Sequence, residues 1–335
     1  MHPVRDQLGR PLGDLRVSVT DRCNFRCRYC MPREHFDQDH RYLPRAEILS
    51  FEEIARVVRV LVPLGLRKVR LTGGEPLLRS ELPTLVAMLR GFPELELALT
   101  TNGSLLSKHA SALRSAGLDR LTISLDSIEP EVFARMTDSE LPVSDVLAGI
   151  ESARSAGFGP LKINAVVRRG VNDHTLLGLA RHFKASGDIV RFIEYMDVGL
   201  TNGWRMDQVV SGKDIVAMIN TEMPLEPTTP NYAGEVAKRY RYRDGSGEIG
   251  VITSVTQPFC GDCARLRLSA DGHIFGCLFA RAGTDLRALL RASSDDAELS
   301  AAAQRFWQAR GDRYSELRSL GTKSLPRLEM SYLGG

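Results

Sequence analysis

The sequence predicts an α/β protein, a partial TIM-like (β/α)6 barrel followed by a smaller C-terminal α+β domain that closes the barrel. Two observations lead to this prediction. Up to about residue 195, short apolar runs rich in β-branched residues alternate with amphipathic segments. After about residue 220 the alternation stops and strand-like runs follow one another. Strands separated by helices form βαβ units, and these units build a parallel sheet.

Six strands are expected in the first part of the chain. The apolar runs that predict them are residues 15–19, 68–71, 95–99, 120–125, 161–167 and 189–195. The helices expected between them are residues 51–64, 82–89, 105–116, 143–156 and 173–186. A closed barrel of this type needs eight such units. Six units therefore predict an open, curved sheet with one side left for a second domain.

A loop punctuated by Pro224, Pro227 and Pro230 marks the expected boundary between domains 1–220 and 221–335. Further strands are expected at residues 238–242, 249–255 and 265–268, and helices at residues 285–291 and 297–310. The Asp271-Gly272 pair is typical of a hairpin turn, so a strand returning to Cys277 should pair with residues 265–268. A thin polar tail ends the chain.

The composition is that of an ordinary globular protein, with 25% charged and 43% apolar residues among 335. A net charge of +3 is too small to predict nucleic-acid binding. Residues 1–13 lack the apolar core of a signal peptide, and no later apolar run approaches the length of a membrane span. We therefore expect a cytoplasmic protein that binds neither nucleic acid nor a membrane.

All the cysteines fall into two triplets. Cys23, Cys27 and Cys30 have the spacing C-x3-C-x2-C, and the second triplet, Cys260, Cys263 and Cys277, has the spacing C-x2-C-x13-C. A long chain without a signal sequence argues against disulfides. Thiolates grouped in this way suit zinc or an iron–sulfur cluster. With three cysteines, a four-iron cluster keeps one iron open.

Zinc remains an alternative at both triplets, since a closed zinc site needs a fourth ligand. His35 or His40 could complete the first site, and His273 could complete the second. A zinc-stabilised binding module without turnover is therefore the competing class of protein.

Polar residues follow several predicted strands, at the edge of a parallel sheet where sites form. The sets are Thr72-Gly73-Gly74-Glu75-Pro76, Thr100-Thr101-Asn102-Gly103, Ser124-Leu125-Asp126 and Glu194-Tyr195-Met196-Asp197. Paired glycines let a ligand approach the backbone, and a glutamate can accept hydrogen bonds from an ammonium group. Each set could be no more than a turn or a helix cap. Four sets at one edge favour a shared site.

Two arginines lie two residues apart on the predicted strand 265–268. Arg265 and Arg267 therefore share one face, while Leu266 takes the other. Arginine suits phosphate groups because its guanidinium can donate two parallel hydrogen bonds. Without further context the same pair could be a solvated face of a half-buried strand.

The first triplet, with Tyr29 before its last cysteine, resembles the radical S-adenosylmethionine (SAM) enzymes. Four segments together resemble one family among them, the GTP 3′,8-cyclases (MoaA family) that open molybdenum cofactor biosynthesis. These segments are residues 23–32, 72–79, 191–199 and 259–279, and the ending Gly334-Gly335 resembles the family's double-glycine tail. The resemblance covers residues 12–335.

The resemblance implies two [4Fe–4S] clusters and SAM as cofactors. It implies that Cys23, Cys27 and Cys30 hold the cluster that cleaves SAM to a 5′-deoxyadenosyl radical. That radical removes hydrogen from C3′ of GTP, and C3′ then attacks C8 of guanine to give 3′,8-cyclo-7,8-dihydro-GTP. The second triplet, Cys260, Cys263 and Cys277, is implied to hold a cluster whose open iron binds guanine.

The resemblance also implies roles for individual residues. The implied SAM contacts are Tyr29, Gly73, Gly74, Glu75, Ser124 and Met196. The implied GTP contacts are Arg16, Arg70, Thr100, Lys162, Arg265, Leu266 and Arg267, with Arg191 as a weaker candidate. Four of these, Arg16, Arg70, Thr100 and Lys162, are expected at or next to the carboxyl ends of strands. Gly334 and Gly335, with Arg265 and Arg267, are implied to act in catalysis, the glycines by reaching into the active site.

Three partners are implied as well. They are a MoaC-type cyclic pyranopterin monophosphate synthase that takes the product, a reductant protein of the flavodoxin or ferredoxin type, and a second copy of the chain in a homodimer. Within enzymes, the alternative is a peptide-modifying radical SAM maturase with an auxiliary cluster.

Overall fold

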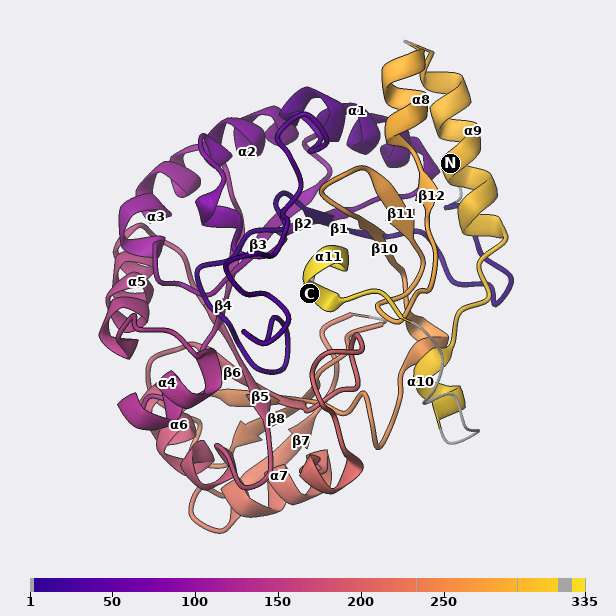
Figure 1. Ribbon diagram of the computed structural model, residues 1–335. Helices are drawn as coiled ribbons and strands as arrows, with labels where there is room; N and C mark the ends of the chain where they lie inside the picture. The colour runs from indigo at the N-terminus through magenta and orange to yellow at the C-terminus, as the bar shows by residue number, and fades with distance from the viewer. Residues whose placement is uncertain (1–2, 233, 294, 319–326, 335) are drawn as a thin grey trace.

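Six parallel strands form the centre of one curved sheet, which the computed structural model describes for residues 3–232, 234–293, 295–318 and 327–334. The strands are β1 (Asp14–Ser18), β2 (Lys68–Thr72), β3 (Glu96–Thr101), β4 (Arg120–Ser124), β5 (Lys162–Val167) and β6 (Ile189–Glu194). They lie in sequence order, each parallel to the next. Figure 1 shows them curving into a ring with helices outside, which confirms the predicted partial barrel.

The predicted helices are present on the outer face of this sheet. They are α1 (Phe51–Leu61), α2 (Leu82–Arg90), α3 (Leu106–Ser115), α5 (Val143–Ser155) and α6 (Leu176–Phe183). α1 begins with a capping box, in which Ser50 and Glu53 each accept a hydrogen bond from the other's backbone N–H. Its apolar residues, such as Val57 and Leu61, are fully buried against the sheet.

Two further helices were not predicted. α4 (Pro130–Thr137) precedes α5, and α7 (Gly212–Asn220) follows β6. Each is about two turns long, so few apolar positions repeat at helical spacing.

The remaining strands extend both edges of the same sheet. These strands are β7 (Leu225–Thr228), β8 (Lys238–Tyr242), β9 (Glu248–Ile252), β10 (Arg265–Leu268), β11 (His273–Phe275) and β12 (Thr284–Asp285). β9 runs parallel to β6, with β8 and β7 antiparallel beyond it. β10 runs parallel to β1, with β11 and β12 beyond it. The division at residue 220 stays a prediction.

The predicted loop through Pro224, Pro227 and Pro230 is wrong at its centre, because β7 occupies residues 225–228 and Pro227 pairs with Tyr240. β7 is the last strand of the sheet, and proline is tolerated at an edge because its missing N–H has no partner to lose. The predicted hairpin is confirmed, although β11 ends at Phe275 rather than at Cys277.

The end of the chain is not a thin tail. The helices predicted at residues 285–291 and 297–310 are confirmed as α8 (Arg287–Ala292) and α9 (Asp296–Gln308), which pack beside α1. Two short helices that were not predicted follow them, α10 (Tyr314–Leu317) and α11 (Met330–Leu333). Figure 1 shows α11 and the C-terminus in the middle of the ring. Within the described part of the chain, no helix is both long and apolar enough to cross a membrane.

Candidate active site

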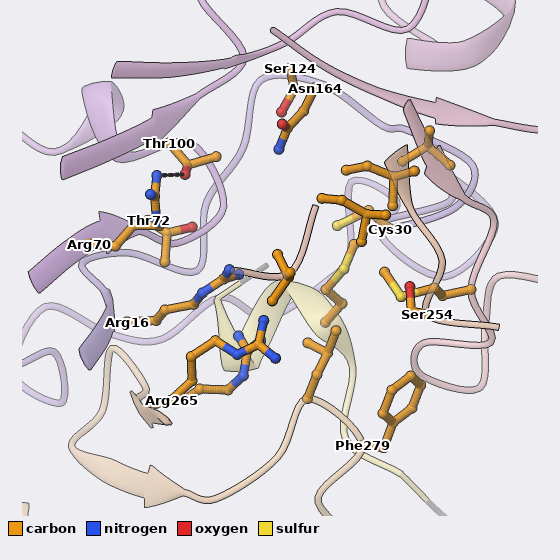
Figure 2. Close-up of a pocket in the computed structure, with 18 of the residues that line it drawn as sticks. Arg16, Cys30, Arg70, Thr72, Thr100, Ser124, Asn164, Ser254, Arg265 and Phe279 are labelled. Atoms are coloured by element: carbon orange, nitrogen blue, oxygen red, sulfur yellow. Dashed lines mark hydrogen bonds between the residues drawn. The ribbon is translucent and has the colours of Figure 1, made fainter. Parts of the chain in front are cut away.

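A cavity of about 310 Å³ lies inside the ring and is lined by residues from distant parts of the chain. Both cysteine triplets line it, as do side chains from β1 to β6 and from β10. In Figure 2, Arg16 and Arg265 direct their guanidinium groups into this cavity, and Cys30 lies across it. The predicted shared site at one edge of the sheet is therefore present as a single cavity.

The loop that carries the first triplet is held against the end of β2. The backbone N–H groups of Gly74 and Glu75 donate to the carbonyl oxygens of Thr20 and Arg22, at 2.8 and 2.7 Å. A Cβ on Gly74 would lie 2.1 Å from the Arg22 oxygen, and one on Gly73 would lie 2.4 Å from the Thr20 oxygen. Both glycines line the cavity. The group that approaches them closely is the chain's own backbone, whereas the sequence analysis expected a ligand there.

We expect Gly74→Ala to lose most of the iron bound at the first triplet, because the added methyl group would push the cysteine loop off β2. Overpacking of this kind costs about 1–3 kcal/mol. Gly178→Ala is the matched control, since a Cβ there meets nothing within 4 Å. Iron and labile sulfide per chain after anaerobic reconstitution measure the effect. Equal iron in the two variants would contradict this account of Gly74.

Glu75 is almost fully buried and already has partners. Its carboxylate accepts hydrogen bonds from the N–H of Leu77 (3.0 Å), the hydroxyl of Thr101 (2.7 Å) and the N–H of Asn102 (2.7 Å). Burial raises the pKa of Glu75 to about 7 against the lowering effect of these bonds. Glu75 thus joins the ends of β2 and β3, and it also lines the cavity.

The other predicted SAM contacts line the same cavity. Tyr29, Ser124 and Met196 are all in its wall. The hydroxyl of Tyr29 donates to Asp126 at 2.9 Å, and burial raises the pKa of Asp126 to about 6. This bond ties the cysteine loop to the end of β4.

All six cysteines are free thiols, and the surroundings of Cys23 and Cys263 shift their pKa values in opposite directions. Burial raises the pKa of Cys23 to about 11, and Glu75 adds to this effect. Burial alone would also raise the pKa of Cys263, but the guanidinium groups of Arg265 and Arg310 outweigh it and lower that pKa to about 6. Cys263 therefore has the more positive surroundings, whereas burial raises the pKa of Cys277 in the same triplet to about 11.

Three arginines form a row across the neighbouring strands β10, β1 and β2. Arg16 pairs in register with Arg267 on one side and with Arg70 on the other. Burial, and then the charges of Arg267, Arg265 and Arg70, lower the pKa of Arg16 well below its usual value. Like charges placed side by side on a sheet are destabilising.

No carboxylate forms an ion pair with these arginines among the described residues. Arg70 donates instead to the hydroxyls of Thr100 and Thr122, each at 3.0 Å, and the Nε of Arg16 has no partner within that part of the chain. Arg191, on β6, donates to Asn164 at 2.9 Å and lines the cavity with them. This uncompensated positive charge fits an anionic ligand.

Several predicted GTP contacts occupy other positions than expected. Thr100 is near the carboxyl end of β3 as predicted, but Arg16 and Arg70 are the middle residues of their strands. Lys162 is the first residue of β5, at the amino end, and does not line the cavity. The predicted runs 15–19 and 161–167 already put Arg16 and Lys162 near amino ends, so the expected carboxyl-end position came from the resemblance and not from the strand pattern.

Leu266 is also outside the cavity wall. Its side chain is fully buried in the hydrophobic core, on the face of β10 opposite to Arg265 and Arg267. A contact from Leu266 to a ligand in the cavity would have to use its main chain.

The C-terminal segment enters the ring. Leu333 is fully buried, and the carbonyl oxygen of Gly334 accepts a hydrogen bond from Arg267. Gly334 has a φ of +72°, and a Cβ there would lie 2.8 Å from Thr72. Gly335 lies outside the described residues.

The histidines proposed as zinc ligands are not placed for that role. His273 contacts Asp271 (3.3 Å) and the hydroxyl of Tyr332 (3.5 Å), and the ring of His40 lies between Phe36 and Tyr42. His35 is exposed, and none of the three lines the cavity. Within the described ranges, no three side chains of His, Cys, Asp or Glu converge as ligands of one metal ion do.

Each triplet therefore fits a cluster better than a single ion. In each triplet three thiols face the shared cavity and no fourth cysteine joins them. Three thiolates are the donor set expected for a [4Fe–4S] cluster with one open iron. Sequence reasoning did not find Arg10 and Arg310, which also line the cavity, since lone arginines before β1 and after α9 carry no pattern.

Two family models match the chain. The model of the radical SAM superfamily matches residues 17–183, and the model named Molybdenum Cofactor Synthesis C matches residues 188–316.

Curated relatives match nearly the whole length. A GTP 3′,8-cyclase of Acidothermus cellulolyticus is 55% identical, and one of Staphylococcus epidermidis is 45% identical, with 99% of each chain covered in both cases. Among solved structures, Streptococcus suis SuiB bound to S-adenosylmethionine matches with a TM-score of 0.64 at 14% identity, over 97% of this chain and 78% of that one. The SuiB match shows the fold alone. The identities over full length, together with the two family models, show that this chain belongs to the GTP 3′,8-cyclase family of radical SAM enzymes.

Proposed function

We propose that this chain converts GTP to (8S)-3′,8-cyclo-7,8-dihydroguanosine 5′-triphosphate, the first step of molybdenum cofactor biosynthesis. The observation that carries the proposal is the cavity itself. There two cysteine triplets face a row of arginines that form no ion pair with any carboxylate among the described residues. The triplets suit clusters, and the arginines suit a triphosphate.

SAM and an iron–sulfur cluster are the cofactors of the radical SAM superfamily to which the chain belongs. In this proposal Cys23, Cys27 and Cys30 hold that cluster. When bound and reduced, it supplies the electron that cleaves SAM to methionine and a 5′-deoxyadenosyl radical. Because the backbone of Gly74 and Glu75 and the Tyr29–Asp126 bond hold the cysteine loop on β2 and β4, the chain would position SAM inside the ring.

The second triplet, Cys260, Cys263 and Cys277, is proposed to hold a second [4Fe–4S] cluster whose open position takes guanine. Arg265 and Arg267 lie beside it on β10, and Arg16 and Arg70 continue the same row. Their guanidinium groups would bind the triphosphate and hold C3′ of GTP toward the SAM side of the cavity. The 5′-deoxyadenosyl radical would take a hydrogen atom from C3′, and a bond would form between C3′ and C8 of guanine. One further electron from the reductant and one proton would complete the 7,8-dihydro product.

The tail completes the enclosure in this proposal. α11 and Gly334 lie inside the ring, where they would exclude water from a reactive radical. Gly334 and Gly335 would act through Arg267, which already donates to the Gly334 carbonyl.

We expect Arg16→Met to weaken GTP binding and to stabilise the free protein. Loss of one partner of a buried charge pair costs about 2–5 kcal/mol, or ~30-fold or more in affinity. Without GTP, the same change removes repulsion from Arg267, Arg265 and Arg70, so the thermal midpoint should rise. Equilibrium binding and thermal unfolding of the reconstituted protein measure the two effects. Arg305→Met, an exposed arginine on α9, should change neither, and an unaltered GTP affinity in Arg16→Met would refute the role.

Three partners belong to the proposal. The cyclised nucleotide would pass to a MoaC-type synthase, and a cytoplasmic flavodoxin or ferredoxin would supply electrons. The active form would be a homodimer.

The test is anaerobic. The chain is reconstituted with iron and sulfide, reduced, and given SAM with GTP, with ATP or with neither nucleotide. We expect 5′-deoxyadenosine to form with GTP only, matched by conversion of GTP to the cyclised product. SAM cleavage without dependence on GTP would overturn the substrate and would favour a peptide-modifying enzyme. Absence of cleavage in a protein loaded with both clusters would favour a binding module.

A further inference from the structure

A buried charge network lies behind the second cysteine triplet, outside the residues assigned to SAM or GTP. Asp6, in the segment before β1, accepts hydrogen bonds from Arg10 (2.6 Å) and from Arg310 (3.0 Å), which follows α9. The Asp6 side chain is fully buried, and both arginine side chains are 2% exposed. Asp6 is thus the buried carboxylate that serves both guanidinium groups, while the 41% exposed side chain of Asp312 approaches the Nε of Arg310 at 3.8 Å.

The two arginines hold all three segments that carry the second triplet. Arg10 donates to the carbonyl oxygen of Cys260 at 2.8 Å. Arg310 donates to the carbonyl oxygen of Cys263 at 2.8 Å and to that of Gly276, the residue before Cys277, at 2.9 Å. The network therefore fixes the main chain at each cysteine of the triplet.

Arg310 also reaches one of the sulfur atoms. Its Nη2 donates to Cys263 Sγ at 3.2 Å, and Nη2 and Nε of Arg265 donate to the same sulfur at 3.3 and 3.4 Å. Cys263 thus receives three hydrogen bonds from two charged groups. In the first triplet, Cys23 Sγ accepts from the neutral N–H of Phe25 at 3.4 Å, and the carboxyl groups of Glu75 and Asp126 line the cavity nearby.

We propose that Arg310, balanced by Asp6, positions the second triplet and, with Arg265, raises the reduction potential of the cluster bound there. The physical reason is that reduction adds one negative charge, which nearby positive charge and hydrogen bonds to sulfur stabilise. This inference rests on the proposed second cluster.

The experiment uses the full-length chain with Cys23, Cys27 and Cys30 replaced by alanine, so that only the second triplet can hold a cluster. After reconstitution, iron and sulfide are measured and the potential is determined by titration with spectroscopic detection. Arg310→Met and Asp6→Asn are compared in this background, and Arg305→Met on the exposed face of α9 is the matched control.

The two variants should shift the potential in opposite directions. Arg310→Met removes a positive charge and a hydrogen bond to sulfur, so the potential should fall. Asp6→Asn removes the negative charge that balances the arginines, so the potential should rise. Arg305→Met should leave it unchanged. A purely structural role would not produce shifts of opposite sign. If Arg310→Met fails to load iron, Arg310→Lys takes its place, with a smaller fall expected because the charge remains.

Two results would overturn the inference in distinguishable ways. A background protein that binds no iron would refute the second cluster itself, and with it this part of the proposed function. A background protein with about four iron atoms per chain, whose potential is unmoved or moves in one direction only, would refute the role of Arg310 and Asp6 alone.

Discussion

Replacing Cys260 with serine should abolish cyclisation of GTP while SAM cleavage by an artificial reductant continues. Cys260 lies in the cavity wall, and the carbonyl oxygen of this residue is held by Arg10. A serine hydroxyl is a poor substitute for a soft thiolate ligand, so the second cluster should be lost or loosened. The first triplet belongs to a separate loop tied to β2 and β4, so it should keep its cluster.

The measurement is the amount of 5′-deoxyadenosine and of cyclised nucleotide formed by the same reduced protein. Cys30→Ser is the matched control, and it should lose both products because the first cluster cleaves SAM. Unaltered formation of the cyclised product by Cys260→Ser would contradict the role assigned to the second triplet.

Removing Gly334 and Gly335 should also abolish cyclisation, although the chain should remain folded. The truncation removes the carbonyl group that Arg267 binds and leaves a new terminal carboxylate on Leu333, inside a ring lined by arginines. Arg267 is itself almost fully buried, and burial followed by the charge of Arg265 lowers its pKa to about 10. A misplaced carboxylate would pair with Arg267 and compete with the triphosphate.

The tail is otherwise well anchored, which makes the truncation a local change. Glu329 accepts hydrogen bonds from the N–H of Leu200 (2.9 Å) and the hydroxyl of Thr201 (3.0 Å), and Tyr332 donates to Asp271 at 2.9 Å. The thermal midpoint and the iron content of the truncated protein should therefore match those of the full chain, and only product formation should disappear. Full cyclase activity after truncation would rule out a catalytic role for the two glycines.

The order of the first six strands could be predicted from the sequence because each βαβ unit is local. Apolar runs such as residues 68–71 and amphipathic stretches such as residues 51–64 carry their periodicity within a few residues of one another. The spacing of Cys23, Cys27 and Cys30 is local too, so the chemistry of that loop was readable without coordinates.

The prediction was wrong where it depended on a residue's position within a strand or on a short edge strand. Lys162 lies at the amino end of β5 and not at a carboxyl end, and β7 occupies the loop expected around Pro227. Neither a strand's first residue nor an edge strand that tolerates proline has a distinct pattern of apolar residues. The Gly73-Gly74 pair was recognised as a close approach, but the partner of that approach, the backbone of residues 20–22, could not be known.

The sequence by itself determined the local chemistry of this protein, namely its cysteine triplets, its strand-ending polar sets and the arginine pair on β10. Only the tertiary structure decided which of these meet. The parallel pairing of β10 with β1 sets Arg267 beside Arg16, and Asp6 binds Arg310 across 304 residues of chain. Such contacts join segments with no shared periodicity, because they depend on how the whole sheet closes and on which charges become buried when it does.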